Sequence, residues 1–163
     1  MGKKTLLSPK NDFVFHKLFA ENTRILISLL QAVLDLPVEE YEYIQVVDPN
    51  LKREYIDDKL GILDIKIFTT KKTVIDVEIQ NRQQAFIWKR LLFYDAKLTL
   101  EQIHKGKKYE NINKVIIIYI ADHILIKENA VYHHCFQLYD VNTKIYFPDS
   151  HAIHTLELPK VHK

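Results

Sequence analysis

The chain has 163 residues, of which 47% are hydrophobic and 27% are charged, a composition typical of one globular domain and not of a disordered segment. The formal net charge of +2 excludes a strongly basic nucleic-acid coat, although residues 1–80 carry 11 Lys/Arg against 13 Asp/Glu and residues 81–163 carry 12 against 8. Three glycines exclude a glycine-rich nucleotide loop, and no apolar run approaches the ~20 residues of a membrane helix, so we expect neither an organic cofactor nor a membrane partner.

Two short helices are predicted at the N-terminal end. Asn11 and Asp12 are short polar residues of the kind that cap the free N–H groups of a helix start. The apolar residues within 13–19 form one side of this first helix. A second helix is expected over residues 23–34, where apolar side chains follow helical spacing and Pro37 ends the pattern.

Strands dominate the next part of the chain. Residues 41–47 have strand character, and the charged residues 52–59 predict a surface loop. Two strand-like runs, residues 62–69 and 73–80, flank the turn residues 70–72 and predict an antiparallel hairpin.

A long helix and a buried strand follow the hairpin. Residues 83–104 contain no glycine or proline and predict one helix that stops at Gly106. Residues 114–121 are nearly all apolar, which is typical of a strand covered on both faces. Three more short strands are expected, over residues 132–139, 144–147 and 153–158. This order predicts an α/β fold with a central mixed sheet flanked by helices, built as a single domain over residues 1–163.

The predicted hairpin gathers acidic side chains on one of its faces. Asp76, Glu78 and Gln80 alternate with apolar residues in the second strand, as Asp64 and Lys66 do in the first. Because successive side chains of a strand point to opposite faces, these polar residues share one face of the hairpin.

The register of the hairpin brings two acids together. If the turn is centred on Lys71, Asp64 lies opposite Glu78, and Lys66 lies opposite Asp76, which would neutralise it. Opposed Cβ atoms are about 4.5–5.5 Å apart. Two carboxylates at that separation repel each other unless a cation lies between them. The pair therefore predicts a site for a hard divalent ion such as Mg²⁺, with a solvated acidic face as the alternative.

The acidic hairpin resembles the signature of the PD-(D/E)XK nucleases, in which an acid in one strand precedes Glu-x-Lys or Glu-x-Gln in the next. Here the signature is Asp64 followed by Glu78-Ile79-Gln80. The surrounding sequence is similar to the transposase-associated branch, the recombination-promoting nucleases, over roughly residues 6–160. The similar stretches are Ser8-Pro9-Lys10-Asn11-Asp12-Phe13-Val14-Phe15, Lys59 before Leu63-Asp64, Arg90-x-x-x-Tyr94 and Gly106-x-x-Tyr109.

The resemblance implies a restriction-endonuclease-like core and Mg²⁺-dependent DNA cleavage, with Mn²⁺ as a substitute, that leaves a 5′-phosphate and a 3′-hydroxyl. It implies Asp64 and Glu78 as metal ligands, with the backbone carbonyl of Ile79 as a further ligand. Glu78 and Gln80 are expected to position the attacking water. Gln80 stands where many relatives have a lysine, whose charge glutamine lacks, and Lys66 is a candidate to supply that charge.

The long predicted helix offers contacts for a phosphate. Arg90, Tyr94 and Lys97 are spaced so that they share one side of that helix. We expect this side to face the metal site and the scissile phosphate, with a solvated helix side as the alternative.

Several expectations concern the protein as a whole. Cys135 is the only cysteine, which favours a reducing, cytoplasmic setting, and its apolar surroundings predict a buried side chain. The eight histidines lack the spacing of known zinc sites. Relatives generally continue further, so the chain is expected to be truncated at its C-terminus relative to the family. A homodimer is expected, because cutting both DNA strands needs two sites.

Two alternative functions are open at this point. The substitution at Gln80 and the short chain favour a nuclease fold that has lost cleavage and binds DNA or a partner protein. The second alternative is an inactive remnant of a mobile element.

Overall fold

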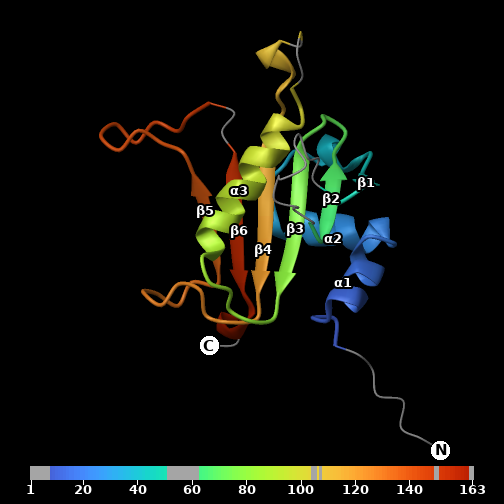
Figure 1. Cartoon of the computed structure of the whole chain (residues 1–163), viewed down its shortest axis with the longest axis vertical. Helices are drawn as coiled ribbons and strands as arrows, with labels where there is room; N and C mark the ends of the chain where they lie inside the picture. Colours follow the sequence, from blue (N-terminus) through green and yellow to red (C-terminus); the bar gives the residue numbers. More distant parts are fainter. Residues whose placement is uncertain (1–7, 51–62, 104–105, 107, 149–150, 162–163) are drawn as a thin grey trace, which may run out of the picture.

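The centre of the molecule is a six-stranded mixed sheet with the strand order β1-β2-β3-β4-β6-β5 and helices on both faces (Figure 1). The structure, a computed structural model, describes residues 8–50, 63–103, 106, 108–148 and 151–161. The predicted α/β fold with a central mixed sheet flanked by helices is confirmed. The loop predicted over residues 52–59 lies outside the described residues.

Two helices pack on one face of the sheet. They are α1 (Asp12–Phe19) and α2 (Thr23–Val33), and both predicted helices are confirmed. Each begins after an asparagine, Asn11 or Asn22, whose side-chain oxygen accepts hydrogen bonds from backbone N–H groups of the first turn. No helix in the described part of the chain is long and apolar enough to cross a membrane.

The first strand is shorter than predicted. A 3₁₀ turn, η1 (Val38–Tyr41), occupies the start of the predicted range 41–47, and β1 is confined to Gln45–Val47. The cause is the burial of Tyr41, whose hydroxyl donates a hydrogen bond to the carbonyl of Leu34 and ties the segment to the end of α2.

The hairpin has the predicted register. Its strands are β2 (Ile65–Phe68) and β3 (Val74–Gln80), and Lys66 lies opposite Asp76. The side chains that face α1 and α2 are Ile65, Ile67, Ile75, Val77 and Ile79. The polar side chains of the hairpin therefore lie on the other face, beneath α3.

The helix α3 (Ile87–Leu100) covers that second face and is shorter than the predicted range 83–104. Before it, Phe86 has a φ of 60°, a left-handed conformation that is uncommon outside glycine and that turns the chain into the helix. After it, the side-chain amide of Gln102 bonds to the backbone N–H and C=O of Asn113, so the chain leaves the helix before Gly106.

The middle of the sheet is parallel. β4 (Val115–Ala121) lies between β3 and β6 (Ala152–Glu157) and is buried along its whole length, as predicted. β5 (His133–Gln137) pairs antiparallel with β6 at the sheet edge. Cys135 on β5 is exposed, so the prediction that it is buried is wrong, because an edge strand leaves part of its surface uncovered. Two further 3₁₀ turns are η2 (Tyr109–Asn111) and η3 (Leu158–Lys160).

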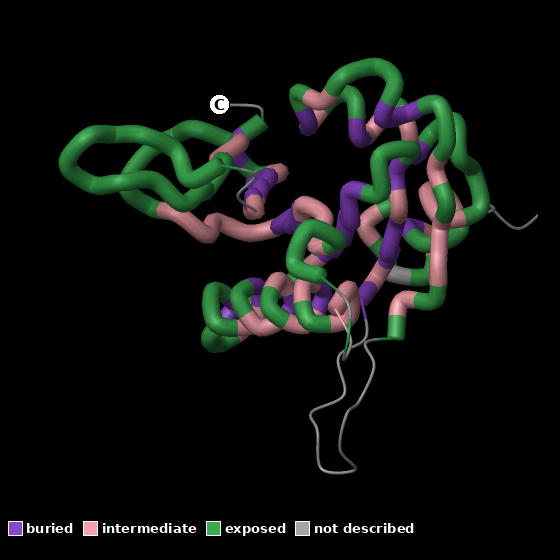
Figure 2. Tube along the Cα trace, turned by 90° about the horizontal axis from the view of Figure 1, so that it is seen from above, coloured by how far each residue is buried: buried purple, intermediate pink, exposed green. Residues whose placement is uncertain are grey.

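The connection from β5 to β6 forms an exposed arm. The strand predicted over residues 144–147 is wrong, because the arm has one isolated bridge, Tyr139 to Tyr146, and no neighbouring sheet strand to pair with. We call residues 138–148 the apolar arm, since all are exposed and many are large and apolar (Figure 2). Its large apolar side chains are Leu138, Tyr139, Val141, Ile145, Tyr146 and Phe147.

A buried histidine of β6 makes the stability of the fold depend on pH. The ring nitrogens of His154 lie 2.9 Å from His133 Nε2 and 3.5 Å from Cys135 Sγ. Burial, and then the neighbouring His133, lowers the pKa of His154 from 6.5 to about 4. Between these values the unfolded chain binds a proton that the folded chain does not. The stability contributed by the neutral ring is therefore complete above pH 6.5 and is lost as the pH falls toward 4.

We expect His154→Gln to flatten this pH dependence. Urea denaturation between pH 4 and pH 7.5 should show that the wild type loses up to about 3 kcal/mol more of its unfolding free energy than the variant does. His16→Gln, a change on the exposed side of α1, is the matched control. Parallel profiles for the wild type and His154→Gln would contradict the prediction.

Candidate functional site

Two carboxylates meet where the β2–β3 ladder ends. The backbone N–H of Asp64 donates to Oε1 of Glu78 at 3.1 Å, and the N–H of Ile79 donates to Oδ2 of Asp64 at 2.8 Å. Each of the two carboxylates thus accepts a hydrogen bond from a backbone N–H group of the opposite strand segment. Glu78 is 1% exposed and Asp64 is half-buried, so the two acids predicted to face each other do so at the edge of the core.

The backbone of Ile79 faces the same place. In an antiparallel pair, the N–H and C=O of one residue point to the same neighbouring strand. Because the N–H of Ile79 reaches Asp64, its carbonyl lies on the side of the carboxylates. The role of this carbonyl as a metal ligand stays a prediction.

α3 brings a cation to Glu78. Nη2 of Arg90 lies 3.5 Å from Oε2 of Glu78, and Nε of Arg90 donates to the hydroxyl of Tyr94 at 2.7 Å. The guanidinium also lies 5.1 Å from the centroid of the Tyr94 ring. Arg90 therefore reaches Glu78, and Tyr94 contacts Arg90, while their role as phosphate contacts stays a prediction. Lys97 is half-buried one turn further along α3.

Gln80 belongs to a chain of side-chain hydrogen bonds that ends at Arg90. Nε2 of Gln84 donates to Oε1 of Gln80 at 2.5 Å, and Oε1 of Gln84 accepts a hydrogen bond from Nη1 of Arg90. Gln84 is a residue that sequence reasoning missed. The predicted helix started at residue 83, whereas residue 84 lies in the connection before α3, and that placement hid its role.

Lys66 forms an ion pair with Glu101 at the end of α3. Its Nζ lies 2.5 Å from Oε2 of Glu101, and both side chains are nearly buried. The expectation that Asp76 neutralises Lys66 is wrong, although the two residues are opposed in the hairpin. The end of α3 carries Glu101 over β2, which gives the ammonium a closer acid than the sequence could reveal.

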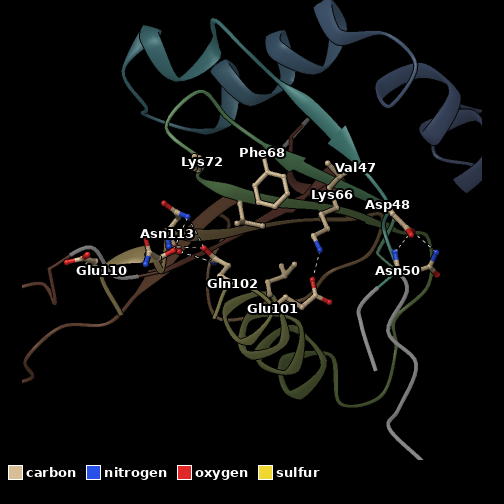
Figure 3. Close-up of a pocket in the computed structure, with 13 residues that line it drawn as sticks. Val47, Asp48, Asn50, Lys66, Phe68, Lys72, Glu101, Gln102, Glu110 and Asn113 are labelled. Atoms are coloured by element: carbon tan, nitrogen blue, oxygen red, sulfur yellow. Dashed lines mark hydrogen bonds and ion pairs between the residues drawn. The ribbon is translucent and has the colours of Figure 1, made fainter. Parts of the chain in front are cut away.

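The ion pair of Lys66 and Glu101 forms part of the wall of a cavity of about 810 Å³ (Figure 3). Other described residues lining it are Val47, Asp48, Asn50, Phe68, Lys72, Val74, Leu98, Gln102, Glu110, Asn111 and Asn113. The described lining does not include Asp64 or Glu78. The described lining is therefore separate from the acidic pair, although Lys66, which belongs to that lining, is only two residues from Asp64.

Two further polar groups are buried next to Glu78. Asp76 is fully buried, and neither of its carboxylate oxygens has a hydrogen-bond partner among the described residues. The same holds for the hydroxyl of Tyr119, which lies opposite Glu78 in the β3–β4 register. Tyr119 was not singled out from the sequence, because the register of a parallel pair depends on a long crossover that local pattern does not determine.

The electrostatics of the site reflect this burial. Burial, and then the charges of Glu78 and Asp64, raises the pKa of Asp76 well above its ordinary value. Burial raises the pKa of Tyr119 to about 12, so its hydroxyl keeps its proton. Burial alone would lower the pKa of Arg90, but Tyr94 and the acids outweigh it and raise that pKa. Arg90 is therefore a permanent cation beside the carboxylates.

The donor set fits a hard divalent cation. Carboxylate oxygens and a backbone carbonyl are the ligands that Mg²⁺ prefers. The two buried oxygens of Asp76 have no hydrogen-bond partner among the described residues, which indicates that a cation or water binds beside them. In the described part of the chain, no three His, Cys, Asp or Glu side chains form a group that could hold a metal ion. Mg²⁺ does not require such a group, since it takes one or two carboxylates and completes its shell with water and phosphate oxygens.

Comparison of the sequence with known proteins identifies a family. Neither the curated proteins nor the solved structures contain a match to the chain. Residues 9–163 match the family model of the PD-(D/E)XK nuclease family transposases, whose members generally use divalent metal ions and act on DNA. The six-stranded mixed sheet with flanking helices agrees with the restriction-endonuclease-like core that the resemblance implied. Because the match spans nearly the whole sequence, the chain belongs to the PD-(D/E)XK nuclease family transposases.

Proposed function

We propose that the protein is a divalent-metal-dependent DNA endonuclease that acts in transposition or recombination. The observation that carries the proposal is the reciprocal bonding of Asp64 and Glu78, which fixes two carboxylates side by side with Arg90 on the second. Asp64, Glu78 and the carbonyl of Ile79 would hold Mg²⁺, or Mn²⁺ in its place. A cytoplasmic setting is part of the proposal, because the single thiol of Cys135 is exposed.

When bound, such an ion polarises a phosphoryl oxygen and lowers the pKa of water. The chain itself supplies orientation. Glu78 and Gln80 position the attacking water, and the bond from Gln84 holds the amide of Gln80 in one orientation. The water oxygen forms a bond to phosphorus while the bond from phosphorus to the 3′ oxygen breaks. The products are a 5′-phosphate and a 3′-hydroxyl.

Arg90 offsets the charge that develops on the phosphate. Its Nη2 lies 3.5 Å from Oε2 of Glu78, and its fork of N–H groups suits phosphate oxygens. Tyr94 keeps the guanidinium in place through a hydrogen bond and ring contact. Lys66 contributes less in this proposal, because its ammonium is bound to Glu101, and Lys97 contacts the DNA backbone further along α3.

The first test is cleavage of supercoiled plasmid with Mg²⁺ or Mn²⁺. We expect nicking or linearisation that chelation stops and that Asp64→Ala and Glu78→Ala each reduce by roughly 10²-fold or more, since each removes an anchor of the ion. Glu39→Ala, which removes an exposed acid of η1, is the control and should cleave like the wild type. Folded wild type that binds DNA without cutting it under either metal would instead favour the alternative function, a binding module.

A second test separates the charge of Arg90 from its shape. Arg90→Lys keeps a cation but loses the planar fork that bonds Tyr94, Gln84 and Glu78 together. We expect kcat to fall by roughly 10²-fold, with DNA affinity changed only a few-fold. Arg24→Lys, an exposed change on α2 across the sheet, is the matched control. Equal kcat for Arg90→Lys and Arg24→Lys would remove Arg90 from the mechanism.

A homodimer is part of the proposed function, because cutting both strands needs two sites. β5 is an edge strand, and the apolar arm that follows it exposes a run of large apolar side chains. Edges and apolar patches of this kind mark association surfaces. The second copy is the occupant we propose, since pairing of the same edge in two chains would continue the sheet and cover both arms.

Light scattering at micromolar concentration should give twice the 19.3 kDa mass of the chain. We expect the double variant Ile145→Asp, Phe147→Asp to be monomeric, because it places charge at the centre of the apolar arm. Lys127→Asp, a change at an exposed residue outside the arm, should remain dimeric. A monomeric wild type would rule out this assembly.

A further inference from the structure

Two buried polar side chains, Asp76 and Tyr119, lie next to Glu78. Asp76 and Tyr119 are both 0% exposed, and the oxygens of both side chains have no hydrogen-bond partner among the described residues. Buried polar groups in folded proteins are almost always satisfied, by protein atoms or by ordered water. Water is therefore the natural partner for these oxygens.

Two neighbouring cations, Lys66 and Arg90, bond to residues other than Asp76. Lys66, which is opposite Asp76 in the hairpin, is bound to Glu101. Arg90 bonds to Tyr94 and Gln84 as well as to Glu78. Within the described part of the chain, neither cation bonds to the carboxyl group of Asp76, so direct ion pairing does not explain its burial.

Both groups are placed around one carboxylate. Asp76 precedes Glu78 by two residues on the same strand face, and Tyr119 lies opposite Glu78 on β4. The carboxyl group of Asp76 can accept a hydrogen bond from water, and the hydroxyl of Tyr119 can donate one or accept one. Together they can bind water from two sides at the inner end of the site, away from the half-buried Asp64.

A cation bound at the acidic pair would order that water. The carboxyl groups of Asp64, Asp76 and Glu78 lie on one face of the hairpin, and Arg90 bonds to Glu78. A divalent cation held by Asp64 and Glu78 would keep several of its waters, as Mg²⁺ does when two carboxylates hold it. Those waters are hydrogen-bond donors that require acceptors in the second layer.

We propose that Asp76 and Tyr119 form the outer shell of the divalent-ion site at Asp64 and Glu78, binding the water molecules that the ion retains. The inference rests on the proposed metal site and adds to it two positioning residues. Asp76 accepts hydrogen bonds from the retained water, and Tyr119 fixes the same water layer from β4. Their effect is on the affinity and geometry of the hydrated ion.

The test measures metal binding alone, through the loss of the electron paramagnetic resonance signal of free Mn²⁺ on titration of the protein without DNA. We expect Asp76→Asn and Tyr119→Phe each to weaken Mn²⁺ binding by about 10- to 100-fold. The metal-free melting temperature of Asp76→Asn should be close to that of the wild type, because the amide replaces a buried carboxyl group of the same shape whose oxygens have no hydrogen-bond partner among the described residues.

Glu40→Gln is the matched control for altering a buried acid. Glu40 is 7% exposed and accepts hydrogen bonds from the hydroxyls of Thr69 and Thr73, away from the acidic pair. We expect this change to lower the melting temperature and to leave Mn²⁺ affinity within twofold of the wild type.

The outcomes separate this inference from the proposed function. If Asp64→Ala abolishes Mn²⁺ binding while Asp76→Asn and Tyr119→Phe bind like the wild type, the metal site stands and the outer shell is overturned. If the wild type binds no Mn²⁺, both are overturned. A lower melting temperature with unchanged affinity in Asp76→Asn assigns that residue a merely structural role and also overturns the inference. Should Asp76→Asn fail to fold, Tyr119→Phe decides by the same tenfold criterion.

Discussion

The hydrogen bonds that Asp64 and Glu78 exchange with each other's strands are the contacts on which the site depends. They continue the β2–β3 ladder past its last backbone pair, using side chains in place of carbonyls. Each backbone N–H holds its carboxyl group in position and offsets part of the repulsion between two close acids. The fold therefore fixes the two acidic side chains before any cation arrives, and the other polar groups of the site are arranged around them.

The hairpin could be predicted in detail because its interactions are local. The alternation of apolar residues fixed the register of β2 and β3, and with it the meeting of Asp64 and Glu78. Contacts from distant segments could not be predicted in the same way. Glu101 replaced Asp76 as the partner of Lys66, and Tyr119 came to lie beside Glu78, because both depend on the α3 crossover between parallel strands. Local pattern carries no information on where such a crossover returns.

The ends of α3 show why boundaries were less predictable than the helix itself. Nothing in residues 83–86 forbids a helix, yet Phe86 adopts a left-handed conformation and Gln84 uses its side chain to join Gln80 to Arg90. Tertiary hydrogen bonds outweighed local propensity there. As a result, Gln80 on the strand is connected through Gln84 to Arg90 on the helix.

The parallel centre of the sheet also constrains how the protein can be made. β4, a run of seven buried residues, needs β6 on one side, and residues 122–151 must be synthesised before β6 begins. At roughly 5–20 residues per second, the ribosome leaves this apolar strand with one open edge for a few seconds. During that time the hairpin that carries both acids is already complete, whereas the sheet that supports it is not. The nascent chain is then most exposed to aggregation, and a chaperone that shields β4 would act in that interval.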